Sequence, residues 1–197
     1  MNQSQQQLSR AHRQRDDFFT STGTGHDDRT SPDHHSSNRE VPHMQTVNGI
    51  DALRAAIGQD LGTSEWYPLE QARVDAFADA TEDHQWIHVD RERAQDGPFG
   101  TTVAHGYLLL ALVPHLCWQV FETTGIAMEI NYGLDRVRFP APARIPCDIR
   151  ARVRLESVEP SGAAFLLKLQ VVVEGRDEGK PLCVAETLGY LVPEEPN

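Results

Sequence analysis

Hydrophobic and polar positions divide the chain into a polar N-terminal segment and a longer segment with regular apolar patterns. Residues 1–43 contain almost no aliphatic side chains and are crowded with Ser, Gln, His, Asp, Asn and Arg. Such a segment cannot bury enough apolar surface to offset the entropy lost on ordering. The pattern therefore predicts a disordered tail over residues 1–43 and a single folded domain over residues 44–197.

Three stretches of the folded segment have apolar residues at helical spacing. Residues 50–57 and 69–80 each show one apolar face, which is typical of a helix packed on a core. Residues 104–122 are apolar nearly all round, which is typical of a helix enclosed by other structure. Pro114 removes one backbone hydrogen bond inside this helix, so we expect a bend there.

After Gly125 the spacing of apolar residues changes from helical to alternating. Residues 147–175 alternate aliphatic side chains with arginines and then reach a turn signal at residues 160–162, which predicts a hairpin with one solvent-facing side. Residues 128–139 and 182–192 predict two further strands. Together these patterns predict an α+β fold in which the apolar helix covers an antiparallel sheet.

Charge and cysteine content exclude several classes of protein. The chain has 18 Lys and Arg against 29 Asp and Glu, and this excess of negative charge argues against nucleic acid or an anionic membrane as the main partner. The sequence contains neither an apolar run of about 18 residues nor a signal-peptide pattern, so we expect a cytoplasmic protein. Cys117, Cys147 and Cys183 are far apart among apolar neighbours, which predicts buried reduced thiols.

The stretch ATEDHQWIHVDRERAQDGPFGTTVAHG carries the densest set of chemically active side chains. One hypothesis is a metal site, because His84 and His88 would face the same way on a helix, and His105 with Asp83 or Asp90 could complete the ligands. This hypothesis requires a helix where the preceding one is expected to end, and the stretch lacks the His-Glu-x-x-His order. We therefore expect no metal.

An acid–base pair is the second hypothesis for this stretch. Asp83 and His88 would point about 140° apart on a continuous helix, so they meet only if the chain is irregular between them. A carboxylate and an imidazole that share one water can divide proton removal and proton delivery. The backbone N–H of Gly106, at the start of the apolar helix, could hold an oxyanion, or the glycine could serve packing alone.

Two stretches, FADATEDHQWIHVDRERAQDGPFGTTVAHGYLLLALVP and INYGLDRVRFPAPA, resemble the MaoC-like dehydratases of the hotdog fold. The similarity is to the NodN-type branch, which is related to (R)-specific enoyl-CoA hydratases. It implies a central helix wrapped by an antiparallel sheet, a homodimer formed by joining sheets, and an active site without metal or organic cofactor. It also implies that Asp83 and His88 are the catalytic pair, that the Gly106 N–H holds the thioester oxygen, and that His105 and Gln85 contribute to substrate binding.

The sequence departs from the family pattern in three places, one of which is ARIPCDIRARV, where the glycine usual before this strand is missing. Trp86-Ile87 stand where many relatives carry Asn-Pro, and Pro114 stands where some hydratases carry a small polar residue. The resemblance implies (R)-specific hydration of a 2-enoyl thioester, or the reverse dehydration, with the substrate carried by CoA or an acyl carrier. The alternatives are an acyl-CoA thioesterase of the same fold and a non-catalytic module that binds acyl-CoA.

Overall fold

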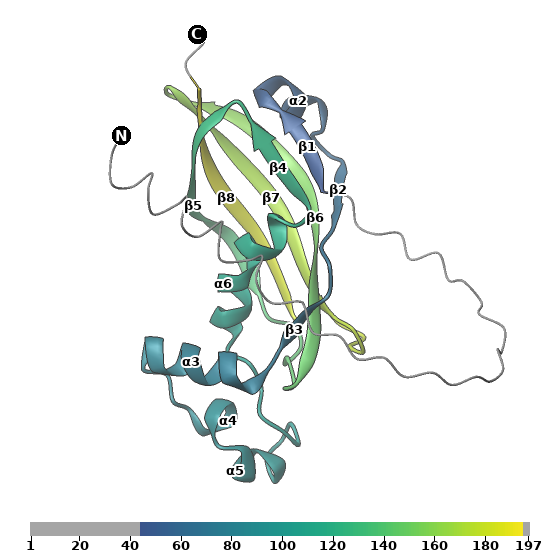
Figure 1. Ribbon diagram of the computed structural model, residues 1–197, viewed down its shortest axis with the longest axis vertical. Coiled ribbons are helices and arrows are strands. Elements are labelled where there is room, and N and C mark those ends of the chain that lie inside the picture. Colours follow the sequence, from purple (N-terminus) through teal and green to yellow (C-terminus); the bar gives the residue numbers. More distant parts are fainter. Residues whose placement is uncertain (1–43, 195–197) are drawn as a thin grey trace, which may run out of the picture. The chain divides into compact units, whose positions relative to one another are not determined.

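The computed structural model describes residues 44–194 (Figure 1). The predicted disordered tail, residues 1–43, lies outside the described residues. The elements, in chain order, are β1 (Gln45–Asn48), α2 (Gly49–Ala55), β2 (Asp60–Thr63), β3 (Tyr67–Leu69), α3 (Gln71–Thr81), α4 (Trp86–Val89), α5 (Arg91–Gln95), α6 (Gly106–Cys117), β4 (Phe121–Thr124), β5 (Ile126–Arg138), β6 (Cys147–Ser161), β7 (Ala164–Gly175) and β8 (Cys183–Pro193).

Six strands form one antiparallel sheet in the order β2, β6, β7, β8, β5, with β3 also pairing with β6. Buried and exposed side chains alternate along β6: Ala151 and Val153 are fully buried, whereas Arg152 and Arg154 are exposed. The β6–β7 turn contains Gly162 with φ +63°, a left-handed conformation that favours glycine. The predicted hairpin and the two further predicted strands are therefore confirmed.

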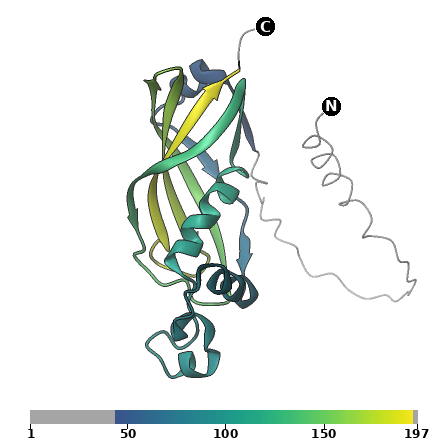
Figure 2. The ribbon, with the colours of Figure 1, turned by 90° about the vertical axis from the view of Figure 1, so that its left-hand side faces the viewer.

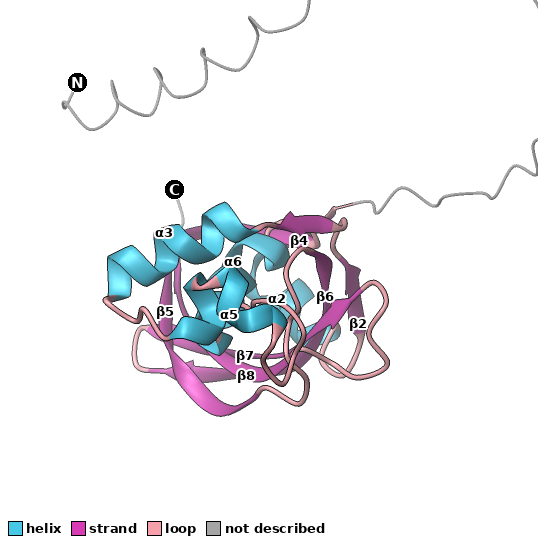
Figure 3. Cartoon of the chain, turned by 90° about the horizontal axis from the view of Figure 1, so that it is seen from below, coloured by secondary structure: helices cyan, strands magenta, loops and turns pink. Residues whose placement is uncertain are grey.

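Helix α6 lies against the concave face of this sheet (Figures 1 and 2). Seen from below, the strands curve around it (Figure 3). Leu109 and Leu116 of α6 are buried in the same apolar core as Leu155 and Val171 of the sheet. Burial of these aliphatic side chains is the main force holding helix and sheet together. The predicted α+β arrangement with a central apolar helix is confirmed.

The central helix is shorter than its sequence pattern indicates. We predicted a helix over residues 104–122, but α6 ends at Cys117, three residues after Pro114. The next residues form tight turns, and Phe121–Thr124 then becomes β4, which pairs in parallel with β1. Phe121 is buried in the core from a strand instead of a helix. Periodicity alone does not separate these two ways of burying an apolar residue.

The cysteines are free thiols, as predicted; Cys117 and Cys183 are also buried as predicted, whereas Cys147 is only partly buried. Burial raises the pKa of Cys117 to about 12, and it raises the pKa values of Cys147 and Cys183 to about 11. A thiol with a raised pKa is a poor nucleophile because little thiolate is present at neutral pH. Among residues 44–194, no helix is both long and apolar enough to cross a membrane.

Candidate active site

The backbone between α3 and α4 is irregular, as the acid–base hypothesis requires. Glu82 follows α3 with φ 60°, in the left-handed region, and Gln85 is extended with ψ 134°. A one-turn helix, α4, then starts at Trp86 and carries His88. These two changes of direction bring His88 back toward Asp83.

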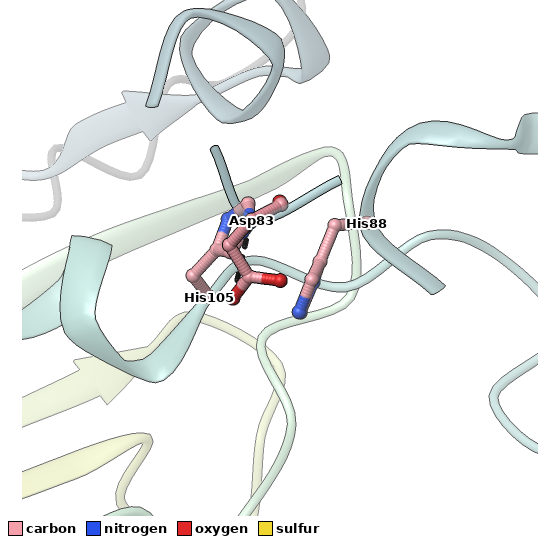
Figure 4. Close-up of side chains that lie close together, drawn as sticks. All are labelled: Asp83, His88 and His105. Carbon is pink, nitrogen blue, oxygen red and sulfur yellow. Dashed lines mark hydrogen bonds and ion pairs between the residues drawn. The ribbon is translucent and has the colours of Figure 1, made fainter. Parts of the chain in front are cut away.

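Three side chains meet in front of α6 (Figure 4). One nitrogen or oxygen atom from each of Asp83, His88 and His105 lies within 4.8 Å of the other two. The Asp83 side chain is 54% exposed, whereas His88 and His105 are buried. The two imidazole rings stack, with 3.8 Å between their centroids and 26° between their planes. A solvent-reachable carboxylate therefore stands beside a buried imidazole.

Hydrogen bonding sets the tautomer of His88. Its Nδ1 lies 2.6 Å from the carbonyl oxygen of Val103. Because a carbonyl only accepts, Nδ1 carries the hydrogen and Nε2 of the neutral ring carries a lone pair. Burial lowers the pKa of His88, the neighbouring His105 lowers it further, and the Val103 carbonyl and Asp83 act in the opposite direction. His88 is therefore suited to accept a proton at Nε2 near neutral pH.

His105 is bonded to the main chain of Asp83 and does not face solvent. Its Nε2–H donates to the Asp83 carbonyl oxygen at 2.9 Å, and the same nitrogen lies 4.0 Å from a carboxylate oxygen of Asp83. Nδ1 of His105 is buried and has no hydrogen-bond partner among residues 44–194. The His105 ring thus contacts both the main chain of Asp83 and the ring of His88.

The segment just before α6 holds the site in place. The Val103 N–H donates to the Ile87 carbonyl at 3.0 Å, and Ala104 donates to Ala143 at 2.9 Å. The side-chain amide of Gln71, the first residue of α3, donates to the His88 carbonyl at 2.7 Å and accepts a hydrogen bond from the Thr102 hydroxyl.

Sequence reasoning did not identify these supporting groups, Gln71, Thr102 and Val103. A glutamine at the start of an amphipathic helix is ordinary in sequence, and Val103 acts through its backbone carbonyl, which leaves no trace in residue type. Only the buried position of Thr102, which is 3% exposed, marks it as unusual for a polar residue.

Gly106 is the first residue of α6, and its N–H donates to no group among residues 44–194. A Cβ at this position would lie 2.8 Å from a ring carbon of Phe139. A side chain at this position would therefore require the Phe139 ring to move. Its unpaired N–H also stands at the end of the helix where the macrodipole favours negative charge.

The structure divides the candidate metal ligands. His84 turns to Asp79, with 3.0 Å between its Nε2 and a carboxylate oxygen, and Asp90 accepts from the Arg93 N–H at 3.0 Å. Asp83, His88 and His105 are the candidates that come together, and one nitrogen of each histidine is already hydrogen-bonded to a main-chain carbonyl oxygen.

Gln85 stands beside this group at the start of α4. Its side chain is exposed and makes no hydrogen bond to residues 44–194. Its carbonyl accepts from the His88 N–H at 2.9 Å. Gln85 therefore contributes to α4 through its backbone, and its amide side chain is free to meet a ligand.

A cavity of about 750 Å³ lies along the remaining part of α6. It is bounded by α6 residues such as Leu110, Val113 and Cys117 and by residues of β5, and its lining is mainly apolar. Glu129 of β5 also faces this cavity, and burial raises the pKa of its carboxyl. Its carboxylate makes no hydrogen bond or ion pair with the described part of the chain.

Comparison with known proteins agrees with this architecture. The family described as "MaoC like domain" matches residues 52–172. The chain is 47% identical over 146 residues to 3-hydroxyacyl-thioester dehydratase Z of Mycobacterium tuberculosis, covering 74% of this chain and 97% of that protein. It is 42% identical over 141 residues to Nodulation protein N of Rhizobium leguminosarum bv. viciae, covering 68% of this chain and 86% of that protein.

Among solved structures, the unliganded R-hydratase PhaJ1 of Pseudomonas aeruginosa superposes with a TM-score of 0.56 at 20% identity. That match covers 70% of this chain and 83% of that one. The likeness establishes the hotdog fold that the sequence resemblance implied. With the family match over residues 52–172 and two relatives above 40% identity, the chain belongs to the MaoC-like dehydratase family.

Proposed function

We propose that this protein adds water to a 2-enoyl thioester, or removes it from an (R)-3-hydroxyacyl thioester. The observation that carries the proposal is the position of Asp83 and His88 in front of an α6 N-terminus with an unpaired N–H at Gly106. Family membership supports the reaction class. Neither the metal nor the organic cofactor chemistry of other hydro-lyases is needed, because side chains and backbone supply every group in the step below.

In the hydration direction, Nε2 of His88 takes a proton from a water molecule whose oxygen bonds to the β-carbon. The electron pair of the double bond moves toward the thioester oxygen, where the Gly106 N–H stabilises the developing charge. His88 then returns the proton to the α-carbon and the carbonyl re-forms. The Asp83 carboxylate accepts a hydrogen bond from the second hydrogen of the water, which stays on the oxygen and becomes part of the product hydroxyl, and so orients the water. Dehydration follows the same path in reverse.

The cavity along α6 is the proposed place for the acyl chain. Its α6 lining starts at Leu110, one turn after Gly106, and it is mainly apolar, as an aliphatic chain requires. The more polar remainder of the substrate, CoA or an acyl carrier, would stay outside, on the exposed side of Asp83.

The proposal is tested by an assay on crotonyl-CoA and longer 2-enoyl-CoAs, with chiral analysis of the product. We expect loss of enoyl absorbance and formation of the (R)-3-hydroxyacyl thioester. Asp83→Asn and His88→Gln should each lower kcat by roughly 10²-fold or more while the fold is retained, as for loss of a general acid–base group. Near-normal turnover by both folded variants would contradict the assignment of the pair.

The same assay separates the alternatives. A thioesterase also needs a carboxylate, a water and an oxyanion donor, but it releases free thiol, which a thiol reagent detects. A module that only binds acyl-CoA would give saturable binding with no product of either kind. Release of thiol without hydration, or binding without turnover, would overturn the proposal.

We also propose that the protein is a homodimer formed through β5. This strand is the last in the sheet order, so β8 is its only neighbour among residues 44–194. Four of its large apolar side chains are between 42% and 64% exposed: Met128, Ile130, Tyr132 and Leu134. An unpaired apolar edge favours pairing with another strand. Light scattering at micromolar concentration should give about twice the chain mass, and a mass of 22.0 kDa would contradict the proposal.

A further inference from the structure

His105 is the most deeply buried side chain of the site, at 2% exposure. It immediately precedes α6, and its ring contacts two others. The centroid of the Phe77 ring is 5.1 Å away with the planes tilted by 55°, and the centroid of the His88 ring is 3.8 Å away with the planes 26° apart. This placement leaves the imidazole no face toward solvent, so His105 does not meet a substrate directly.

Hydrogen bonding gives this ring a definite orientation. The Asp83 carbonyl can only accept, so the hydrogen lies on Nε2, which donates to it at 2.9 Å. A hydrogen on Nδ1 would be buried without an acceptor among residues 44–194. The ring is thus held in one tautomer, with its donor aimed at the main chain of Asp83.

The Asp83 main chain has little other support. It follows Glu82, whose φ of 60° is unusual for a residue other than glycine, and it precedes the exposed residues His84 and Gln85. The Asp83 side chain is itself more than half exposed. The hydrogen bond from His105 is therefore the attachment that joins this turn to the start of α6.

We propose that His105 is a positioning residue that sets the main-chain position of Asp83 through Nε2–H and supports the His88 ring by stacking. Together with the Val103 carbonyl, which holds Nδ1 of His88, it makes residues 103–105 the common support of both reacting groups. The role of His105 in turnover rests on the proposed function, whereas its role in holding the Asp83 turn does not.

Two substitutions separate the two parts of this role. His105→Phe keeps an aromatic ring against His88 but removes the donor. His105→Gln keeps an N–H donor near the position of Nε2 but removes the ring. His115→Phe is the matched control, because His115 is an exposed histidine of α6 that does not line the site.

We expect His105→Phe to lower kcat by roughly 10- to 100-fold with KM changed less than about twofold, since substrate contacts remain and a misplaced reacting group mainly affects the chemical step. His105→Gln should recover a substantial part of that loss, and His115→Phe should match the wild type. A folded His105→Phe enzyme with normal kcat, or a Gln variant no better than the Phe variant, would overturn the proposal.

Amide hydrogen exchange provides a test that does not depend on turnover. In His105→Phe, the peptide covering residues 80–87 should exchange about fivefold or more faster than in the wild type, as expected for loss of one hydrogen bond. Peptides from β7 should be unchanged. Unchanged exchange in the 80–87 peptide would refute the positioning role even if hydration is observed. If the 80–87 peptide exchanges faster in His105→Phe but the wild-type protein has no hydratase activity, the positioning role of His105 would be supported. Only the proposed function would then be contradicted.

Discussion

The two ends of α6 are built differently. At its N-terminus, each of the two proposed catalytic residues is held by a hydrogen bond: the His88 ring donates to the Val103 carbonyl, and the Asp83 carbonyl accepts from the His105 ring. Along the rest of the helix, the cavity is lined by side chains that pack without directed bonds, and the Glu129 carboxylate has no partner in the described chain. The hydrogen bonds at the N-terminus fix the positions of Asp83 and His88. The side-chain lining of the cavity can change its shape and polarity by substitution. We therefore expect the first end to control turnover and the second to control selectivity.

The largest effect that tests this comparison is expected at Gly106. Because both Pro and Ala would bring a Cβ to within 2.8 Å of the Phe139 ring, the substitutions are best made in a Phe139→Ala background. There, Gly106→Pro removes the N–H and should lower kcat by roughly 10²-fold, as for loss of one oxyanion donor. Proline is tolerated in the first turn of a helix, so the melting temperature should stay close to that of the background.

Gly106→Ala in the same background is the control, since it keeps the N–H. Its kcat should lie within about threefold of Phe139→Ala alone, measured on crotonyl-CoA. Equal losses for Pro and Ala would mean that the glycine serves packing only and that the thioester oxygen is held elsewhere.

A smaller effect is expected at Glu129, at the other end of the comparison. Placing an aliphatic chain beside a carboxylate removes water from a charged group at a cost in free energy. Glu129→Leu should therefore raise kcat/KM for long-chain saturated enoyl-CoAs by about three- to tenfold, mostly through KM. Crotonyl-CoA should change less than twofold, since its short chain does not extend along the cavity.

Glu159→Leu is the matched control, because Glu159 is exposed on β6 and does not line the cavity. It should leave the ratio of long-chain to crotonyl-CoA activity unchanged. If Glu129→Leu alters both substrates equally, the cavity does not hold the acyl chain.

The long elements of the fold could be predicted from periodicity. The alternation of buried aliphatic residues with arginines along β6 and the apolar surface of α6 both follow from which side chains face the core. The short strands β1, β2 and β4 could not be predicted, because four residues are too few to establish a period. The same limit explains why the end of α6 was placed five residues too late, at Glu122 and not at Cys117.

The candidate site was predictable in part. Its side-chain members, Asp83, His88 and His105, stand close together in one motif, and the structure brings them together. Its supports were not predictable, because main-chain carbonyls such as that of Val103 are present at every residue. The close contact between Gly106 and Phe139 joins positions 33 residues apart, and only the folded chain shows it.

The backbone hydrogen bonds between residues 102–104 and 143–145 have a consequence for how the protein acquires activity. Thr102 accepts from the Ile145 N–H at 2.9 Å, and Ala104 donates to Ala143 at the same distance. These contacts close a long loop that contains α6, β4 and β5, and such non-local contacts form slowly during folding. The motif that carries Asp83 and His88 is local in sequence, but its support is not. Asp83 and His88 therefore receive their support only when residues 102–104 and 143–145 have come together, and local helix formation alone does not supply it.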